Sequence, residues 1–307
     1  MRNISMLSVS FAMEAAGVPL SEKGILDLLR GNINGTEDMV LLPEMCLGNA
    51  ISKPGDFFLS GISELAAEKQ CYVLASVYLQ ISDTTHTNSA ILFDRHGETA
   101  FCYNKMYPYW NEFDRTDSAV IPGDRAVFAD TDFGRVSAAI CFDANFSDLW
   151  QDMADLDTEL VLFTSAYSAG RQLSAHALNH HYAIVTATRK PDFAVYDIDG
   201  KELTYHRGNC GQILLSRARI DMDKVICHHN FNRDKLNALL KDYPREIELE
   251  HDYDREEWCV IRSMSTEISA KALCREYGIE PLRDYQRRSR NYIHSVRGHL
   301  PVRPIQV

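Results

Sequence analysis

Three short segments of the chain each carry a hydrophobic run up to a polar residue whose side chain can do chemistry. They are MVLLPE, which ends at Glu44, FCYNK, which ends at Lys105, and VSAAIC, which ends at Cys141. A carboxylate, an ammonium group and a thiol can together attack an amide-type carbon and protonate the group that leaves. The pattern therefore predicts that the ends of three buried strands deliver a nucleophile and its two helpers to one site.

The elements that must position these residues alternate between strand and helix signals. In chain order we expect a strand at 4–13, a helix at 22–32 capped by Ser21, a strand at 38–44, a helix at 59–70, a strand at 71–80, hairpins at 89–105 and 127–141 that turn at Gly97 and Gly134, a helix at 146–157 capped by Ser147, a strand at 159–167, a helix at 174–183, and strands at 183–189, 193–200, 201–206 and 213–221. Strand-helix units mixed with hairpins indicate an α/β protein whose sheets are not purely parallel.

Composition limits the classes of protein and partner that fit this chain. Its 307 residues are 45% hydrophobic, which suffices for a substantial core, and its formal net charge of -11 disfavours nucleic acid or an anionic membrane as a partner. The apolar run at 4–13 resembles a leader peptide, but it is short and a helix follows it directly, so we interpret it as the first core strand. Eight cysteines without CxxC pairs favour reduced thiols and a cytoplasmic location.

The order of Glu44, Lys105 and Cys141, together with the sequence segments around them, resembles the nitrilase superfamily, the carbon-nitrogen hydrolases. LLPEMCLG resembles the strand of that family that ends in Pro-Glu, YNKMYP resembles its lysine segment, and AAICFDANF resembles its cysteine elbow. The resemblance runs from about residue 4 to residue 221. It implies a four-layer α-β-β-α sandwich over residues 1–223, with residues 224–307 as a C-terminal extension that packs on the core or on a partner subunit.

The chemistry of the three groups assigns their roles. Cys141 is the candidate nucleophile, Glu44 the base that takes its proton, and Lys105 with the backbone N–H of Phe142 the stabiliser of the oxyanion. The resemblance implies a second glutamate a few residues after the lysine, for which Glu112 is the candidate. Other polar residues of the same loop remain open for that role, namely Asn111, Asp114 and Asp117.

Residues close to this set in the sequence are candidates for contact with the substrate. They are Tyr109, Trp110, Phe142, Asp143, Phe146 and Tyr167. The expected activity is hydrolysis of a small amide or N-carbamoyl compound. Nitrile hydrolysis, acyl transfer and a non-catalytic relative that binds a metabolite or protein partner stay open, because Ser10, Phe11 and Leu178 depart from residues common in the family.

No other motif points to a metal, a cofactor or a nucleotide. His176 and His180 are four residues apart on a predicted helix but have no third ligand, and Gly208 and Gly211 form no phosphate loop. An arginine-rich tail runs from Arg283 to Arg303. We expect it to balance the acidic stretch at 242–258 or to pack on a second subunit of a homodimer or higher homo-oligomer, with neither nucleic acid nor membrane as a partner.

Overall fold

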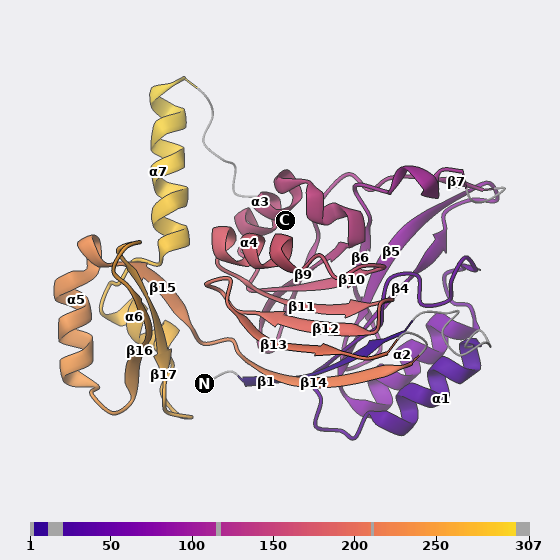
Figure 1. The fold of residues 1–307 in the computed structure, drawn as a ribbon, viewed down its shortest axis with the longest axis horizontal. Coiled ribbons are helices and arrows are strands. Elements are labelled where there is room, and N and C mark those ends of the chain that lie inside the picture. The colour runs from indigo at the N-terminus through magenta and orange to yellow at the C-terminus, as the bar shows by residue number, and fades with distance from the viewer. Residues whose placement is uncertain (1–2, 12–20, 115–117, 210–211, 299–307) are drawn as a thin grey trace.

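Alternating strands and helices form two β-sheets that face each other across a shared hydrophobic core (Figure 1). The computed structural model describes residues 3–11, 21–114, 118–209 and 212–298. The first sheet consists, in spatial order, of β14 (Leu214–Asp221), β1 (Asn3–Ser10), β2 (Met39–Leu41), β4 (Tyr72–Gln80), β5 (Thr85–Phe93) and β6 (Thr99–Asn104), with β3 (Ile51–Ser52) beside β4 and β7 (Ala119–Val120) beside β5. The second consists of β13 (Glu202–Arg207), β12 (Asp192–Tyr196), β11 (Ala183–Thr188), β10 (Leu160–Ser165), β9 (Gly134–Ile140) and β8 (Phe128–Thr131).

A pair of helices covers the outer face of each sheet. The helices α1 (Glu22–Asn32) and α2 (Phe57–Lys69) pack on the first sheet, and α3 (Ser147–Asp155) and α4 (Gly170–His180) pack on the second. The four layers therefore follow the order α-β-β-α that the family resemblance implies, and both sheets mix parallel and antiparallel pairs.

The alternation of side chains in β1 explains why this strand lies between two layers. Ile4 and Met6 face the core between the sheets, whereas Leu7 and Val9 pack with the helices on the outer side. Ser8 also points inward, and its hydroxyl donates a hydrogen bond of 2.8 Å to the carbonyl of Thr186 in the opposite sheet. The strand predicted at 4–13 is confirmed up to Ser10, and residues 12 and 13 of the prediction lie outside the described residues.

Most predicted elements are found, and the differences lie at their ends. Ser21 caps α1 by accepting a hydrogen bond of 3.1 Å from the N–H of Gly24, as predicted. Ser147 was expected to cap the helix at 146–157, but it is the first helical residue, and Phe146 occupies the cap position without a side-chain hydrogen bond. The predicted helix at 174–183 begins four residues earlier and ends at His180, because His181 adopts a left-handed backbone conformation and β11 begins at Ala183.

The strand expected at 38–44 is also shorter than predicted. Only Met39–Leu41 pair as β2, because Pro43 has no N–H to donate and the residues around Glu44 form a turn. Met45 lies in the left-handed region of the backbone, with φ of 49°. Because β2 ends early, Glu44 lies just beyond the C-terminal end of this central strand.

The residues after Asp223 form a small sheet with its own hydrophobic cluster, which we call the C-terminal unit. Its strands lie in the order β15 (Val225–His228), β17 (Trp258–Ser263) and β16 (Ile247–Tyr253), and its helices are α5 (His229–Asp242), α6 (Ala270–Glu276) and α7 (Leu282–Val296). In Figure 1 the C-terminal unit stands beside the sandwich, and α7 rises from it. The expected C-terminal extension thus contains a sheet and a hydrophobic cluster of its own.

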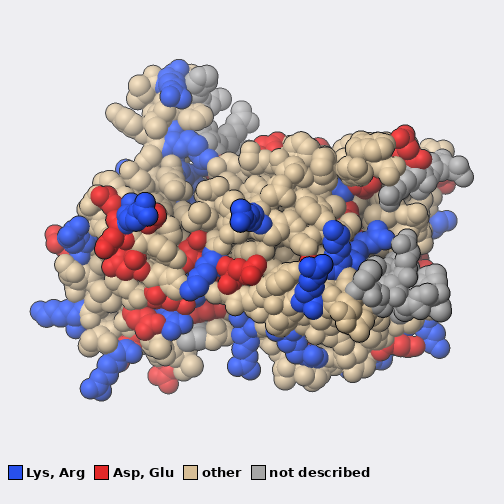
Figure 2. All heavy atoms as spheres, in the orientation of Figure 1, with Lys and Arg blue, Asp and Glu red and all other residues tan. Residues whose placement is uncertain are grey.

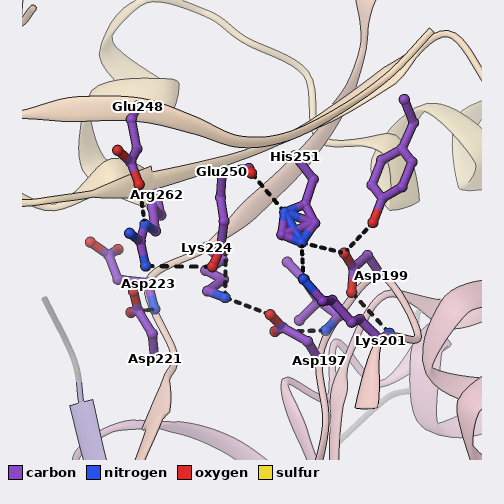
Figure 3. A network of polar contacts seen from close by, with 12 residues as sticks. Asp197, Asp199, Lys201, Asp221, Asp223, Lys224, Glu248, Glu250, His251 and Arg262 are labelled. Atoms are coloured by element: carbon purple, nitrogen blue, oxygen red, sulfur yellow. Dashed lines mark hydrogen bonds and ion pairs between the residues drawn. The ribbon is translucent and has the colours of Figure 1, made fainter. Parts of the chain in front are cut away.

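Buried charges join the C-terminal unit to the sandwich (Figure 3). The ammonium group of Lys224 contacts Asp197 of the sandwich at 2.5 Å and Glu250 of β16 at 2.6 Å. Nearby, the hydroxyl of Tyr253 donates a hydrogen bond of 2.8 Å to Asp199. A cavity of about 480 Å³ lies at the same junction.

The arginines of α7 contact the sandwich and their own unit, not the acidic stretch at 242–258. Arg283 donates hydrogen bonds to the carbonyls of Thr158, His180 and His181, at 2.7 Å to Thr158 and 3.0 Å to His180. Arg290 pairs with Asp155 at 2.6 Å. Balancing of the acidic stretch by the tail is therefore wrong for these arginines, while Arg303 lies outside the described residues.

Charges of both signs are spread over the surface. On the face shown in Figure 2, acidic and basic side chains are interspersed over the C-terminal unit at the left, and the region over α3 and α4 is mostly uncharged. Among the residues that the structure describes, no helix is long and apolar enough to cross a membrane.

Candidate active site

The ends of three strands bring together the residues that the sequence singled out. Glu44 lies in the turn after β2, Lys105 directly follows β6, and Cys141 directly follows β9. Because β2 and β6 belong to the first sheet and β9 to the second, the site lies where the two sheets meet. The side chains of Glu44 and Lys105 are almost completely buried, and Cys141 is half-buried.

Lys105 is held between two carboxylates. Its Nζ lies 2.8 Å from Oε1 of Glu44 and 2.5 Å from Oε1 of Glu112. The structure thus places Glu112, and not a neighbour, beside the lysine. Asp114 of the same loop is exposed, and Asp117 lies outside the described residues.

Glu44 and Glu112 differ in how many of their oxygens already accept hydrogen bonds. Glu112 accepts hydrogen bonds at both oxygens, from Lys105 and the N–H of Tyr109 (2.8 Å) at Oε1 and from Asn88 (2.9 Å) at Oε2. Glu44 accepts from Lys105 and Asn88 at Oε1 alone, and the neighbouring thiol of Cys141 helps to lower the pKa of this carboxylate. Glu44 is therefore the carboxylate with an oxygen left for the thiol.

Burial and neighbouring charge set the protonation of the three groups at neutral pH. Burial alone would raise the pKa of Glu44, but Lys105 and hydrogen bonds from Lys105, Cys141 and Asn88 bring it below the ordinary value of 4.5. Burial would lower the pKa of Lys105, but Glu44, Cys141 and Glu112 raise it. Burial and Glu44 raise the pKa of Cys141 to about 12. The resting site therefore holds a carboxylate, an ammonium ion and a neutral thiol.

The backbone at Cys141 is held in a sharp turn. Its φ is 50°, in the left-handed region that a residue with a Cβ rarely occupies, so the surroundings must stabilise it. Cys141 also begins a short 3-10 turn over Cys141–Asn145. The thiol lies next to Ser165 and the backbone of Ala166, at the end of the neighbouring strand β10.

Asp143 supports this turn. Its Oδ2 accepts hydrogen bonds from the N–H of Ile140 at 2.9 Å and from the hydroxyl of Tyr103 at 2.7 Å, and its Oδ1 accepts one from the N–H of Tyr107 at 2.9 Å. The residue is fully buried, and burial raises its pKa to about 7. Both oxygens are engaged inside the protein, so the predicted contact of Asp143 with substrate is replaced by support of the Cys141 turn.

The predicted aromatic residues gather around the turn. Phe142 lies 5.5 Å from Tyr109 and 5.4 Å from Phe146 between ring centroids, and Tyr109 lies 5.4 Å from Trp110. Trp110 is 63% exposed and Tyr109 is 40% exposed, so these two rings stand at the surface. Their contact with a substrate stays a prediction.

Tyr167 follows β10 in the sequence. Burial raises the pKa of its hydroxyl to about 12. Its hydroxyl donates a hydrogen bond of 3.3 Å to Gln172, whose amide in turn donates one of 2.8 Å to Asn145. A polar chain thus continues from Tyr167 to the end of the Cys141 turn.

Asn88 of β5, which the sequence pattern did not single out, contacts Glu44, Glu112 and Lys105. A signal was available: the alternation in THTNSAIL places Asn88 on the same face as Ala90, which packs in the core between the sheets. A polar side chain on the buried face of a strand needs a partner. Which partner it meets depends on loops far away in the sequence.

The histidines of α4, His176 and His180, are held by contacts within the protein. His176 stacks on Trp150 with ring centroids 4.1 Å apart and bonds to the carbonyl of Ala144 at 2.9 Å. Burial lowers the pKa of His180 to about 3. Within the described ranges, no group of three His, Cys, Asp or Glu side chains could hold a metal ion.

Comparison with known proteins agrees with this architecture. The model of the family described as carbon-nitrogen hydrolase matches residues 24–192, more than half of the chain. A deaminated glutathione amidase of Yersinia enterocolitica is 27% identical over 88 residues, and a hydrolase of Schizosaccharomyces pombe is 24% identical over 113 residues. These matches cover 27% and 35% of the chain and about a third of each relative, 31% and 35%.

Solved structures show the same fold at low sequence identity. An amidase of a Nesterenkonia species superposes with a TM-score of 0.60 at 18% identity, covering 78% of this chain and 96% of the amidase. Nit3 of Saccharomyces cerevisiae, a member of branch 10 of the nitrilase superfamily, superposes with a TM-score of 0.61 at 15% identity, covering 76% of this chain and 94% of Nit3.

Proposed function

The chain belongs to the carbon-nitrogen hydrolase family, within the nitrilase superfamily, and from that premise we propose that it cleaves a non-peptide C–N bond of a small amide through a thioester on Cys141. One observation carries the proposal: a buried Lys105 lies between Glu44 and Glu112, beside a thiol that ends a strand. This cluster contains each group that the reaction requires.

The first step forms the thioester. Glu44 takes the proton of the Cys141 thiol, and the sulfur attacks the carbonyl carbon of the amide. This base is needed because the pKa of Cys141 is about 12, so the thiolate is scarce at neutral pH. Glu44 is the better base of the two glutamates because Glu112 already serves donors at both of its oxygens.

The negative charge that develops on the substrate oxygen needs donors fixed in advance. Lys105 remains an ammonium ion, and the N–H of Phe142 follows the nucleophile directly, so both are candidates for this role. When the C–N bond breaks, protonated Glu44 returns its proton to the leaving ammonia or amine. The products of this half-reaction are the amine and an acyl group on Cys141.

The second step frees the enzyme. Glu44 takes a proton from water, the resulting hydroxide attacks the thioester carbon, and the C–S bond breaks to release a carboxylic acid. Protonated Glu44 gives this proton to the sulfur as the C–S bond breaks, which restores the neutral thiol and the carboxylate. Glu44 thus acts as base and then as acid in each of the two steps.

Amides are the first substrate class to test, followed by N-carbamoyl compounds and nitriles. Two of the similar proteins are named as amidases, which supports an amide substrate. The rings of Tyr109, Trp110 and Phe142 offer apolar contact area to the organic part of the substrate. We therefore propose a small amide with an apolar or aromatic acyl group.

The principal test replaces the nucleophile. Cys141→Ala should reduce the release of ammonia from the best amide to the background rate, because the proposed thioester forms on this sulfur. Cys102→Ala is the matched control, since Cys102 is an exposed cysteine on β6 and should be replaceable with less than a twofold change in rate. Circular dichroism and Tm check that both variants fold. A Cys141→Ala enzyme with most of the original rate would refute the proposal.

A second measurement identifies the bond type and the acyl acceptor. A panel of amides, N-carbamoyl compounds and nitriles is screened for ammonia release, and hydroxylamine is added with the best substrate. A thioester should divert part of the product to a hydroxamic acid, and intact mass should show the acyl group on Cys141. Ligand binding without turnover or acylation across the panel would favour a non-catalytic relative.

A further inference from the structure

One side chain contacts the whole charged cluster without carrying a charge. Asn88 of β5 is 1% exposed, and its Nδ2 donates hydrogen bonds of 2.9 Å to Oε1 of Glu44 and 2.9 Å to Oε2 of Glu112. Its backbone carbonyl accepts a hydrogen bond of 2.8 Å from the N–H of Lys105. Asn88 is thus bonded to all three ionised residues of the candidate site.

We propose that Asn88 is a positioning residue that holds the two carboxylates around Lys105 and keeps one oxygen of Glu44 turned toward the thiol of Cys141. The inference rests on the proposed function. Its physical basis is that both Asn88 and Lys105 donate to the same oxygen of Glu44, Oε1, which fixes the rotation of the carboxylate and leaves Oε2 for the thiol.

The orientation of the Asn88 amide is determined by the two glutamates. In the opposite orientation its oxygen would face two carboxylate oxygens, which repel it, so the NH₂ group must point at them. The amide oxygen Oδ1 is buried and has no hydrogen-bond partner among the described residues. Leaving a buried acceptor unsatisfied is costly, so the two contacts of Nδ2 must outweigh this cost.

Charge explains why an amide suits this position. Two carboxylates and one ammonium ion leave a net charge of minus one, which burial makes costly. The amide of Asn88 stabilises both carboxylates through hydrogen bonds and adds no charge of its own. An aspartate at the same position would bring a third carboxylate to the cluster and would raise the pKa of its neighbours.

The test compares Asn88→Asp and Asn88→Ala with the wild-type enzyme. At pH 7.5 both variants should lower kcat at least tenfold with a smaller change in KM, because the fault lies in the alignment of Glu44 and not in substrate binding. When the pH is lowered toward 5.5, Asn88→Asp should recover part of its rate as the new carboxyl gains a proton and becomes a donor. Asn88→Ala should show no such recovery.

Asn232 supplies a matched control in the C-terminal unit. It is also 1% exposed, and its Nδ2 donates to two oxygens, the carbonyls of His228 at 2.9 Å and Glu280 at 3.2 Å. Asn232→Asp therefore imposes a comparable buried charge far from Cys141. It should lower Tm but change neither kcat nor the pH profile of the folded enzyme.

A readout that needs no substrate separates this inference from the proposed function. The rate of alkylation of Cys141 by iodoacetamide is measured against pH in a Cys102→Ala background. If Asn88 positions the base, its variants should change this rate at least threefold, and Asn232→Asp should not. Should Asn88→Ala fail to fold, Asn88→Ser keeps one donor in a smaller side chain and replaces it.

The outcomes distinguish the two ideas. If wild type turns over amides and the Asn88 variants keep both its kcat and its alkylation profile, the inference is wrong and the proposed function stands. If wild type neither turns over nor acylates, the proposed function is wrong, and the alkylation rates alone decide whether Asn88 controls the thiol.

Discussion

Two buried lysines of this molecule each lie between two carboxylates, and only one belongs to the candidate active site. Lys105 is held by Glu44 and Glu112 at the end of the first sheet. Lys224 is held by one carboxylate of the sandwich and one of the C-terminal unit, at the junction drawn in Figure 3. Both lysines are almost completely buried, and both have a raised pKa.

The carboxylates beside the two lysines behave differently. Burial raises the pKa of Asp197 even though Lys224 opposes the shift, whereas the pKa of Glu44 falls below its ordinary value. Glu44 accepts hydrogen bonds from the side chains of Lys105 and Asn88, whereas Asp197 accepts from one side chain, that of Lys224, and from the N–H of Ile198 at 2.9 Å. A buried ion pair is therefore no mark of a catalytic site by itself.

What marks the first cluster is its connection to a thiol. Cys141 stands at a strand end, in a left-handed backbone conformation, with aromatic rings at the surface beside it. Lys224 instead joins two structural units. The comparison predicts that equal changes at the two lysines have different effects on activity, and that a change at Lys224 acts on stability alone.

The largest expected effect is on activity. Lys105→Met should lower kcat by about 10²–10³-fold or more, because it removes a fixed positive charge near the developing oxyanion. Lys224→Met should keep kcat within about threefold when measured well below its Tm. Similar losses of kcat in the two folded variants would contradict the assignment of different roles.

The next effect is on stability. Lys224→Met leaves the buried carboxylate of Asp197 without its cation, whereas Glu250 is half-buried and keeps Arg262 at 3.4 Å. The free energy of unfolding should therefore fall by about 3–5 kcal/mol, as found for broken buried pairs. Adding Asp197→Asn to Lys224→Met should restore part of this loss. Urea unfolding followed by fluorescence measures both, and a double variant no more stable than the single one would show that the charges are not the cause.

The smallest expected effect concerns pH at the same junction. Burial, aided by Arg283, lowers the pKa of His181 to about 4. An unfolded histidine titrates near 6.5, so the unfolded chain binds the proton first, and this contribution to stability is complete above pH 6.5 and is lost as pH falls toward 4. The Tm should therefore decline less between pH 6.5 and 5 in His181→Asn than in wild type. Parallel curves would assign the decline to other groups.

Local patterns in the sequence predict much of the fold and three residues of the site. The helix after Ser21 has the predicted residues because its cap and its apolar spacing are local signals. Glu44, Lys105 and Cys141 stand out because each follows a hydrophobic run. The contacts of Asn88 and Lys224 could not be predicted, since each unites partners from distant segments, and the end of β2 depends on a turn that Pro43 begins.

The helix α4 acts as a strut between the nucleophile turn and the C-terminal unit. Eleven residues at 1.5 Å of rise each give it a length of about 16 Å. Gln172 in its first turn is hydrogen-bonded to Tyr167 and Asn145. At its other end, the carbonyls of His180 and His181 accept hydrogen bonds from Arg283. Removal of α7 would therefore remove the hydrogen bonds that hold the C-terminal end of α4. A truncation remote from Cys141 should then still alter the position of the turn that carries its sulfur.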